Sequence, residues 1–322
     1  QKNYVKRGFS LLLSLAVSIS GLGYIPGTEM AAEAAGPIQI SSAADLKKIG
    51  KDAKYPMNGD YELVNDIDLG GENWTPIGGA SGEKYGLVSG NRVFSGTFDG
   101  KGHSISGLTI NYDGRESYDA TNQSGLFAMI GSDLASDYAE VRNITFTDVN
   151  ITHILGQGDT IGTLSGDVNG FAQIDNIAVM GGTIMVKGSD GIAYGDLIGA
   201  GGVVGQVRTN HSAVQMSNLY NAANITVEQT VVTQSVRCGG ILGRIHQSEE
   251  IGSLASCLNV GKVTWKGGDG YAINGYSDSP AATSNTANVS NCFYKTGTGN
   301  DFGAATGITE AQMSTSIVDA LG

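Results

Sequence analysis

A seven-residue block recurs four times in the middle of the chain. Its copies begin 38, 39 and 38 residues apart, at Ser124–Ile130, Gly162–Val168, Gly201–Val207 and Gly239–Ile245. A nearly constant period of this length indicates stacked structural units, none of which buries its apolar face alone. The repeat therefore predicts a solenoid rather than a compact globule.

Within the block, the third, fifth and seventh positions are apolar or small in every copy. The sixth position holds chemically unrelated side chains: Met129, Asp167, Gln206 and Arg244. Alternation of this kind is typical of a strand with one buried face and one solvated face. We therefore expect the sixth position to face solvent. The small fifth position is predicted to lie at a corner or at a close approach between two backbones.

A second landmark in each unit is a strand that starts at asparagine or at a substitute for it. These starts are Asn143, Asn176, Asn218, Ser256 and Asn291. Two landmarks per period predict two coils of roughly twenty residues each, hence about 10 to 13 coils and a rod of roughly 50–60 Å. The asparagines are expected to form a ladder in which their amides bond to turn backbone groups and to one another.

The overall charge is acidic, with 19 basic and 31 acidic side chains among 322 residues. The basic residues are scattered along the chain. Nucleic acids and anionic membranes are bound by clustered Lys and Arg, so the composition argues against both as the main partner.

The three cysteines are too few for a disulfide framework in a chain of this size. Cys257 and Cys292 follow the second landmark, where other units carry Ile or Leu. They are predicted to pack as small apolar core residues. Cys238 precedes a pair of glycines and has no spacing partner for a metal site.

Residues 1–35 have the pattern of a secretory signal peptide. Three basic residues precede an apolar run over residues 9–19, and a stretch rich in small residues follows at 31–35. The apolar run is too short to cross a bilayer as a helix, which needs about twenty residues. We expect a chain that is secreted or displayed at the cell surface, with no membrane insertion of its mature part.

Both ends of the expected solenoid carry helix signals. Ser42 is a candidate N-cap for an amphipathic helix that includes Leu46 and Ile49. Thr309 and Gln312 match a capping box. The predicted organisation is a signal peptide over 1–35, a solenoid of stacked strands with its N-terminal cap over 37–308, and a helix over 309–322 that closes the far end or begins a further region.

Three segments together resemble the GLUG-motif surface proteins of bacteria, whose repeats occur in adhesin-like chains and upstream of immunoglobulin A protease domains. They are the entry Ile38–Leu46, the run Tyr61–Leu69 followed by Trp74–Gly78, and Phe94–His103. The resemblance covers roughly residues 37–318 and is most specific over 58–110. It implies an all-β, right-handed parallel β-helix at the cell surface, with short capping helices and a binding or scaffolding role.

The chain departs from the strongest form of this family's repeat, because Gly-Leu-Phe occurs only at residues 125–127. It also has no His-Glu-x-x-His metallopeptidase motif, so protease activity does not carry over.

The candidate ligand-binding residues are the aromatic side chains Trp265, Tyr271 and Tyr276, which can stack on sugars or pack at a corner. Asp66 and Asp68 lie two residues apart on one side of a strand. They are candidate calcium ligands, with hydrogen bonding to local turn amides as the alternative interpretation. No catalytic residue is predicted, and no cofactor is expected apart from the calcium alternative.

The sequence thus predicts a non-catalytic, exported module that binds extracellular glycans or a host or surface protein, or that acts as a scaffold. One alternative is a carbohydrate-active β-helix enzyme, either a polysaccharide lyase or a glycoside hydrolase. Such an enzyme would need clustered carboxylates or basic side chains on one exposed sheet. A second alternative is a structural spacer within a larger surface protein.

Overall fold

The computed structural model divides the chain into residues 1–35 and a compact unit over Gly36–Gly322. It describes residues 36–79, 93–114, 123–155, 159–188, 198–208, 214–228, 236–245, 252–265, 268–275, 289–299 and 305–313. The predicted signal peptide lies outside these ranges. Within them, no helix is long and apolar enough to cross a membrane.

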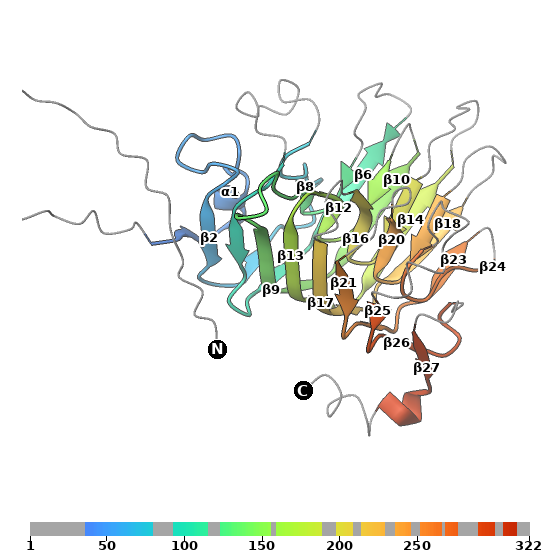
Figure 1. Cartoon of the computed structure of the whole chain (residues 1–322). Coiled ribbons are helices and arrows are strands. Elements are labelled where there is room, and N and C mark those ends of the chain that lie inside the picture. Colours follow the sequence, from blue (N-terminus) through green and yellow to red (C-terminus); the bar gives the residue numbers. More distant parts are fainter. Residues whose placement is uncertain are drawn as a thin grey trace, which may run out of the picture. The chain divides into compact units, whose positions relative to one another are not determined.

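The unit is an all-β parallel solenoid, as predicted, with strands stacked into four sheets (Figure 1). In the part of the chain that the structure describes, sheet A has thirteen strands. Its main path is β1 (Ile38–Ile40), β2 (Asp60–Leu63), β4 (Thr97–Asp99), β9 (Ala139–Thr147), β13 (Ala172–Val179), β17 (Val214–Asn221), β22 (Leu258–Asn259), β26 (Phe293–Lys295) and β27 (Thr306–Ile308). Beside this path lie β3 (Ile67–Asp68), β5 (Ser104–Ser106), β21 (Ser253–Ala255) and β25 (Val289–Ser290).

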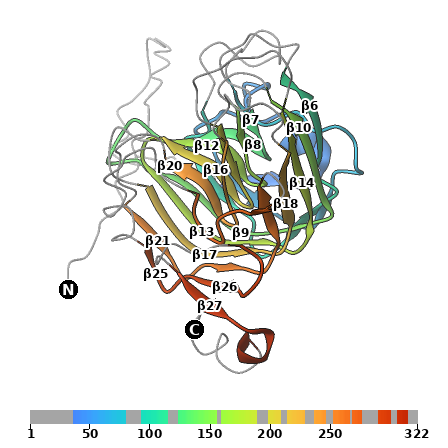
Figure 2. The same cartoon turned by 90° about the vertical axis from the view of Figure 1, so that its right-hand side faces the viewer.

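The other three sheets complete each turn. Sheet B contains β6 (Thr109–Asp113), β10 (Val149–Ile154), β14 (Gly182–Lys187), β18 (Asn224–Glu228), β23 (Val263–Trp265) and β24 (Gly268–Asp269). Sheet C contains β8 (Phe127–Ile130), β12 (Ser165–Asn169), β16 (Val204–Arg208) and β20 (Leu242–Ile245). Sheet D contains β7 (Gln123–Ser124), β11 (Thr160–Ile161), β15 (Ile198–Gly201) and β19 (Val236–Gly239). Figure 2 shows sheets A and B on two sides of the turn and sheets C and D on the third.

One sequence period is a single turn of the solenoid, so the prediction of two coils per period is wrong. Ser165 pairs with Phe127, 38 residues earlier, and with Val204, 39 residues later. A strand from each of sheets A, B, D and C fits into one period, and within the described ranges sheets C and D have four strands each. Neighbouring strands of a sheet lie about 4.8 Å apart, so the nine strands on the main path of sheet A extend over roughly 40 Å. This length is less than the predicted length of the rod.

Sheets C and D approach each other closely at the fifth position of the block. A Cβ atom on Gly205 would lie 2.5 Å from the backbone nitrogen of Ile161, and one on Gly243 would lie 2.4 Å from that of Ala200. Only a residue without a side chain fits between these backbones. The predicted close approach of two backbones is therefore confirmed.

The predicted exposure of the sixth position is wrong for three of its four copies, whereas Met129 is half-buried. Asp167, Gln206 and Arg244 are 1%, 0% and 4% exposed. Sheet D contributes to this burial, because a Cβ atom on Gly199 in β15 would come within 3.1 Å of the Cβ of Arg244. Alternation along one strand indicates two faces, but it does not show that a second sheet covers the outer one.

The asparagine landmarks share one backbone conformation, but the predicted amide ladder is formed only in part, because the side-chain amides of Asn143 and Asn218 bond to Asp99 and Asp175 rather than to another landmark asparagine. Asn143, Asn176, Asn218, Ser256 and Asn291 all have left-handed backbones, with φ between 51° and 59°. Asparagine tolerates this conformation better than most residues do. Asn176 Nδ2 donates to Asn143 Oδ1 at 2.9 Å, so neighbouring rungs are also joined through their side chains.

The core follows the inward positions of the four sheets. In the first turns it contains an aromatic cluster, with ring centroids 4.8 Å apart for Phe94 and Phe127 and 5.6 Å apart for Phe98 and Phe127. Cys257 and Cys292 are buried and free, as expected for core residues.

The predicted helix starts are present at both ends of the unit. Helix α1 (Ala43–Leu46) begins at Ser42, whose side chain accepts from the Asp45 amide, and Leu46 is buried in the core. Residues 310–313 are helical after a capping box in which the Thr309 amide donates to Gln312 Oε1 at 2.9 Å. The remainder of the predicted C-terminal helix lies outside the described residues.

The contact between sheets C and D yields a first prediction. The Gly243→Val variant should lower the free energy of unfolding by about 3 kcal/mol, at the upper end of the usual range for overpacking, because the clashing atoms belong to the main chain. Chemical denaturation measures this change. Gly36→Val is the matched control, since a Cβ there meets nothing within 4 Å. Equal stability of the two variants would contradict the close packing of sheets C and D at Gly243.

Candidate functional site

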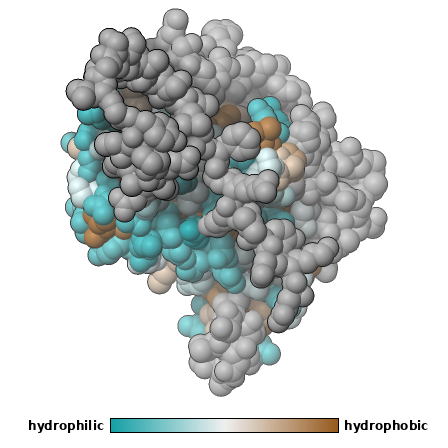
Figure 3. All heavy atoms as spheres, turned by 60° about the vertical axis from the view of Figure 1, so that its left-hand side comes forward, coloured by the Kyte–Doolittle hydropathy of each residue, from teal (hydrophilic) through white to brown (hydrophobic). Residues whose placement is uncertain are grey.

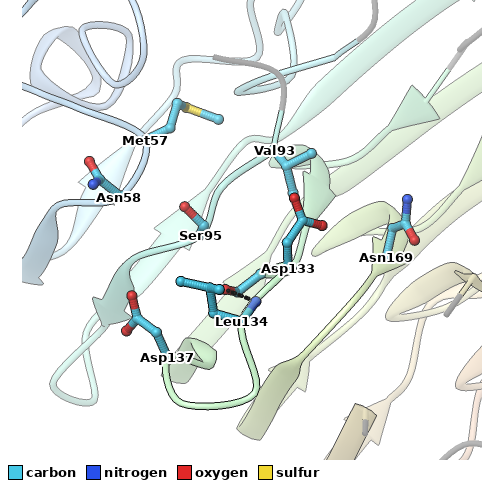
Figure 4. Close-up of a pocket in the computed structure, with 10 residues that line it drawn as sticks. Met57, Asn58, Val93, Ser95, Asp133, Leu134, Asp137 and Asn169 are labelled. Atoms are coloured by element: carbon cyan, nitrogen blue, oxygen red, sulfur yellow. Dashed lines mark hydrogen bonds between the residues drawn. The ribbon is translucent and has the colours of Figure 1, made fainter. Parts of the chain in front are cut away.

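A depression of about 650 Å³ opens beside the corner that leads into sheet A (Figure 4). It brings together short segments before β2 and β4, the connection from β8 to β9, and the end of β12. Its lining residues are Met57, Asn58, Val93, Ser95, Gly131, Ser132, Asp133, Leu134, Asp137 and Asn169. Figure 4 shows Ser95, Asp133 and Leu134 near the middle, with Met57 and Asn58 on one side and Asn169 on the other. Oxygen and amide groups thus surround a few apolar side chains.

The connection that forms this depression is held by its own hydrogen bonds. Ser132 and Phe171 exchange backbone bonds at 3.0 and 2.8 Å. Ser132 Oγ accepts from the Leu134 amide at 3.1 Å, and the Asp137 amide donates to the Leu134 carbonyl at 3.1 Å. The Leu134 side chain remains 59% exposed within this fixed backbone. An apolar side chain held at the surface provides contact area for a ligand.

A second depression, of about 360 Å³, lies on the outer face of sheet A. Strand register creates it, because alternate residues of β9, β13 and β17 point outward and stand in columns. One column is Glu140, Gln173 and Gln215, and the next is Arg142, Asp175 and Ser217. We call these six residues the sheet A groove. The β8–β9 connection of the first depression runs directly into Ala139 and Glu140, so the two depressions adjoin.

The charged groups at the sheet A groove are largely paired with one another. Arg142 Nε lies 3.1 Å from Asp99 Oδ2, and its Nη1 contacts Glu140. Burial opposes ionisation of Asp99, but hydrogen bonds from Asn143, the Lys101 amide and Arg142 outweigh it and hold the pKa of this carboxyl below its usual range. Burial likewise opposes the charge on Arg142, whose pKa is nevertheless raised by its two carboxylate partners.

Asp175 is also engaged within the groove. Its Oδ1 accepts from Ser217 Oγ at 2.6 Å and from Asn218 Nδ2 at 2.8 Å. The amides of Gln173 and Gln215 stand next to these paired groups, in the neighbouring column. The described surface in the view of Figure 3 is mostly hydrophilic, with small hydrophobic patches.

An apolar column follows the sheet A groove on the same face of sheet A. Tyr220 pairs in register with Leu258, which pairs with Phe293. The next residues along β17 and β22, Asn221 and Asn259, are fully buried, so the residues before them point outward. We call Tyr220, Leu258 and Phe293 the apolar ridge. Leu258 is only 7% exposed, so Tyr220 and Phe293, which are half-buried, provide the accessible surface of the ridge. Tyr220 is half-buried, and burial raises the pKa of its phenol.

A buried hydrogen-bonded triad joins sheets B and D. Ser124 Oγ lies 2.8 Å from His153 Nδ1, and His153 Nε2 lies 2.9 Å from Asp159 Oδ2. A neutral imidazole with its proton on Nε2 accepts from the serine and donates to the aspartate. Hydrolytic triads use the same residue types, but these three side chains are all 0% exposed, and the Tyr112 ring stacks on His153 at 4.6 Å. Their geometry indicates a structural role.

A second buried polar group is the sixth-position stack of sheet C. Arg244 Nη1 donates to Gln206 Oε1 at 3.0 Å, and Arg208 Nε lies 3.7 Å from Asp167 Oδ2. Burial raises the pKa of Asp167 to about 6, against the opposing effect of the positive charges of Arg208 and Arg244. The Gln206 side chain and the Val168 amide lie near this carboxylate and oppose the effect of burial only weakly.

Trp265 and Tyr271 are not among the residues that line the two depressions. Trp265 pairs with Val227 in the core-facing column of sheet B and packs against the core. Tyr271 is half-buried and bridges to Gly239, and Tyr276 lies outside the described residues. Their binding role stays a prediction. The sequence did not point to the apolar ridge, although Tyr220 lies in the Asn218 landmark strand.

The two aspartates proposed as calcium candidates bond to nearby groups. Asp66 Oδ1 accepts from the Ser104 amide at 2.7 Å and lies 3.4 Å from His103 Nδ1. Asp68 Oδ1 accepts from the Gly70 amide at 2.8 Å. The described residues contain no group of three or more His, Cys, Asp or Glu side chains placed to hold a metal ion. Calcium binding at Asp66 and Asp68 stays untested.

Comparison with curated proteins finds two relatives of this chain. It is 30% identical to halomucin of Haloquadratum walsbyi over 188 residues, which are 56% of this chain and 2% of that protein. It is 32% identical over 148 residues to a protein of Evansella cellulosilytica named "Putative Gly-rich membrane protein", covering 44% of this chain and 14% of that protein. The chain therefore spans only a small part of the length of either relative.

No family model matches the chain, so membership of the GLUG-motif surface proteins stays a prediction. Among solved structures, the chain is similar to a "putative immunoglobulin A1 protease" from Bacteroides ovatus, with 16% identity and a TM-score of 0.45. That similarity covers 89% of this chain and 88% of the other chain.

Proposed function

We propose that this chain is an exported, non-catalytic binding module of the GLUG-motif type and that its ligand is a neutral extracellular glycan. The glycan lies on the outer face of sheet A, along the first depression, the sheet A groove and the apolar ridge. The observation that carries this proposal is the juxtaposition of two oxygen-rich depressions with an apolar column on one face. Sugars present hydroxyl groups at their edges and C–H groups on their faces, so they match both surfaces.

The polar part of this face supports a neutral ligand. The amides of Gln173 and Gln215 and the hydroxyl of Ser217 are groups that bond sugar hydroxyls. Arg142 is paired with Asp99 and Glu140, so an anionic ligand would compete with two carboxylates for it. The net charge of −12 also disfavours acidic polysaccharides. The apolar ridge offers Tyr220 and Phe293 as stacking surfaces for sugar rings.

A carbohydrate-active enzyme is the second candidate, and one observation favours it. Asp99, Glu140 and Asp175 gather around Arg142 on one exposed sheet, as such an enzyme would require. The surroundings of these carboxyl groups nevertheless favour ligand binding over catalysis. A general acid needs a raised pKa, whereas the pKa of Asp99 is lowered, and Asp175 Oδ1 accepts two hydrogen bonds.

The relatives support a location outside the cytoplasm. One is named halomucin and the other "Putative Gly-rich membrane protein", and this chain corresponds to a small part of each. A β-helix that forms part of a longer surface chain can present sheet A to the surroundings. This location also agrees with the predicted signal peptide over residues 1–35.

A glycan array of neutral and acidic oligosaccharides, followed by calorimetry with the best ligand, tests the proposal. The Tyr220→Ala variant is expected to bind about tenfold more weakly, because a stacking surface is lost. Met180→Ala is the matched control, since Met180 is an exposed apolar residue just after β13 and outside the apolar ridge. Its affinity should equal that of the wild type.

Other outcomes would overturn the proposal. Release of new reducing ends or unsaturated products from any polysaccharide, abolished by Asp175→Asn, would establish the enzyme. Absence of binding across the array would favour the spacer. Tight binding that Tyr220→Ala and Gln215→Ala leave unchanged would place the ligand elsewhere.

A further inference from the structure

Two of the three cysteines stand opposite each other on consecutive turns of sheet A. The register pairs around them, Ala255 with Ser290 and Leu258 with Phe293, both join residues 35 positions apart. Cys257 and Cys292 have the same separation and are therefore register partners. The Phe293 amide donates to the Cys257 carbonyl at 2.7 Å, which ties the two strands together at this rung.

The two thiols also have matching orientations. Cys257 Sγ donates to the carbonyl of Ala255 at 3.3 Å, and Cys292 Sγ donates to that of Ser290 at 3.4 Å, in each case two residues back. The side chains therefore stack on the same side of the sheet. Burial raises the pKa of Cys257, and its hydrogen bond with Cys292 raises it further. That same bond lowers the pKa of Cys292, so the thiols lie within reach of each other.

This placement satisfies the main geometric requirement of a disulfide. Register partners on adjacent strands of a sheet have Cα atoms about 4.8 Å apart. Disulfides join residues whose Cα atoms are about 4.4–6.8 Å apart, and the spacing of register partners falls within this range. The third cysteine, Cys238, lies on a different sheet from the other two and serves as a control for the pairing. Cys238 lies on β19 in sheet D, and burial raises the pKa of its thiol to about 12.

We propose that Cys257 and Cys292 form a disulfide that fastens the last turns of the solenoid. The reaction is exchange with a small-molecule disulfide such as oxidised glutathione. The Cys292 thiolate attacks one sulfur of that disulfide and releases a glutathione thiolate. The Cys257 thiolate then attacks the mixed disulfide at Cys292 and releases the second glutathione. Both protein thiol protons pass to the released thiolates, and one disulfide is reduced for each one formed.

The position of the pair suggests what the bond does. In the described part of the chain, sheets D and C continue beyond β19 and β20 only as single bridges to Tyr271 and Asn274, whereas sheet A continues through β22, β26 and β27. The last turn is thus held by sheet A with less support from the other sheets. Strands at the end of a solenoid open more readily than interior ones. A bond between Cys257 and Cys292 joins β22 to β26 at this end.

The test is refolding of the full chain in a glutathione redox buffer, followed by denaturation, alkylation and intact mass measurement. Reduced protein carries three alkyl groups, because the chain has three cysteines. The proposal predicts one alkyl group, with peptide mapping that links Cys257 to Cys292. The oxidised protein should melt about 5 °C or more above the reduced protein.

Variants distinguish this pair from other links. Cys238→Ser should form the bond and keep the difference in melting temperature between oxidised and reduced protein, whereas Cys257→Ser and Cys292→Ser should lose both. Three alkyl groups on wild-type protein after oxidative refolding would overturn the proposal, as would a link that contains Cys238. Equal melting temperatures of the linked and reduced forms would refute the fastening role.

Discussion

Replacing His153 by leucine should lower the free energy of unfolding by roughly 3–5 kcal/mol. Leucine fills a similar volume but removes the hydrogen bonds to Ser124 Oγ and Asp159 Oδ2. Both former partners are fully buried, so they lose these bonds without gaining water. Urea denaturation followed by circular dichroism measures the loss.

Two further variants separate the hydrogen bonds from packing. His103→Leu is the matched control, because the His103 side chain is 35% exposed on another turn, and it should change stability by less than about 0.5 kcal/mol. Adding Asp159→Asn to His153→Leu should recover part of the loss, since a neutral amide is less costly to bury than a carboxylate. A double variant whose loss equals the sum of the two single losses would show that the triad is not energetically coupled.

Local chemistry made much of the fold predictable from the sequence. The third and seventh positions of the block are apolar in every copy and proved to be buried. The Asn143 and Asn176 landmarks marked left-handed corners because few other residues tolerate that backbone. The capping box at Thr309 was also predictable from the sequence, because both of its partners lie within one helical turn.

The number of turns required information that the sequence pattern lacks. Two landmarks per period are compatible with two short coils and also with one long coil that contains several strands. The choice depends on which strands are neighbours, and Ser165 pairs with Phe127 a full period away. The misplaced sixth position has the same origin, because strand alternation does not reveal that sheet D covers the outer face of sheet C near Gly199 and Arg244.

The candidate site depends on register even more strongly. Glu140, Gln173 and Gln215 form one column only because turns of 33 and 42 residues align them. These unequal spacings result from loops, and no motif in the sequence fixes their length. The buried triad is similar, since Ser124 and His153 belong to different sheets. Aromatic residues such as Trp265 were conspicuous in the sequence, but the structure placed it in a core-facing column.

The Asp167→Asn variant should remove a pH-dependent loss of stability. Burial raises the pKa of Asp167 in the folded chain from the ordinary 3.8 to about 6, so the unfolded chain releases this proton at lower pH than the folded chain does. The group therefore costs little below pH 3.8, and its cost grows as pH rises from 3.8 to about 6 and is constant above that. The full cost is about 3 kcal/mol, at about 1.4 kcal/mol per unit of pKa difference.

Urea denaturation at pH 4 and pH 7 should accordingly show that Asp167→Asn gains stability relative to wild type on going to pH 7. Asp45→Asn provides a control of opposite sign, because the hydrogen bond from Lys48 lowers the pKa of Asp45. That carboxylate stabilises the folded chain above its unfolded pKa, and the benefit is lost as pH falls, so its removal should be felt at pH 7 and not at low pH. Parallel pH profiles for wild type and Asp167→Asn would show that the carboxylate is solvated in the folded chain, contrary to its enclosure between sheets C and D.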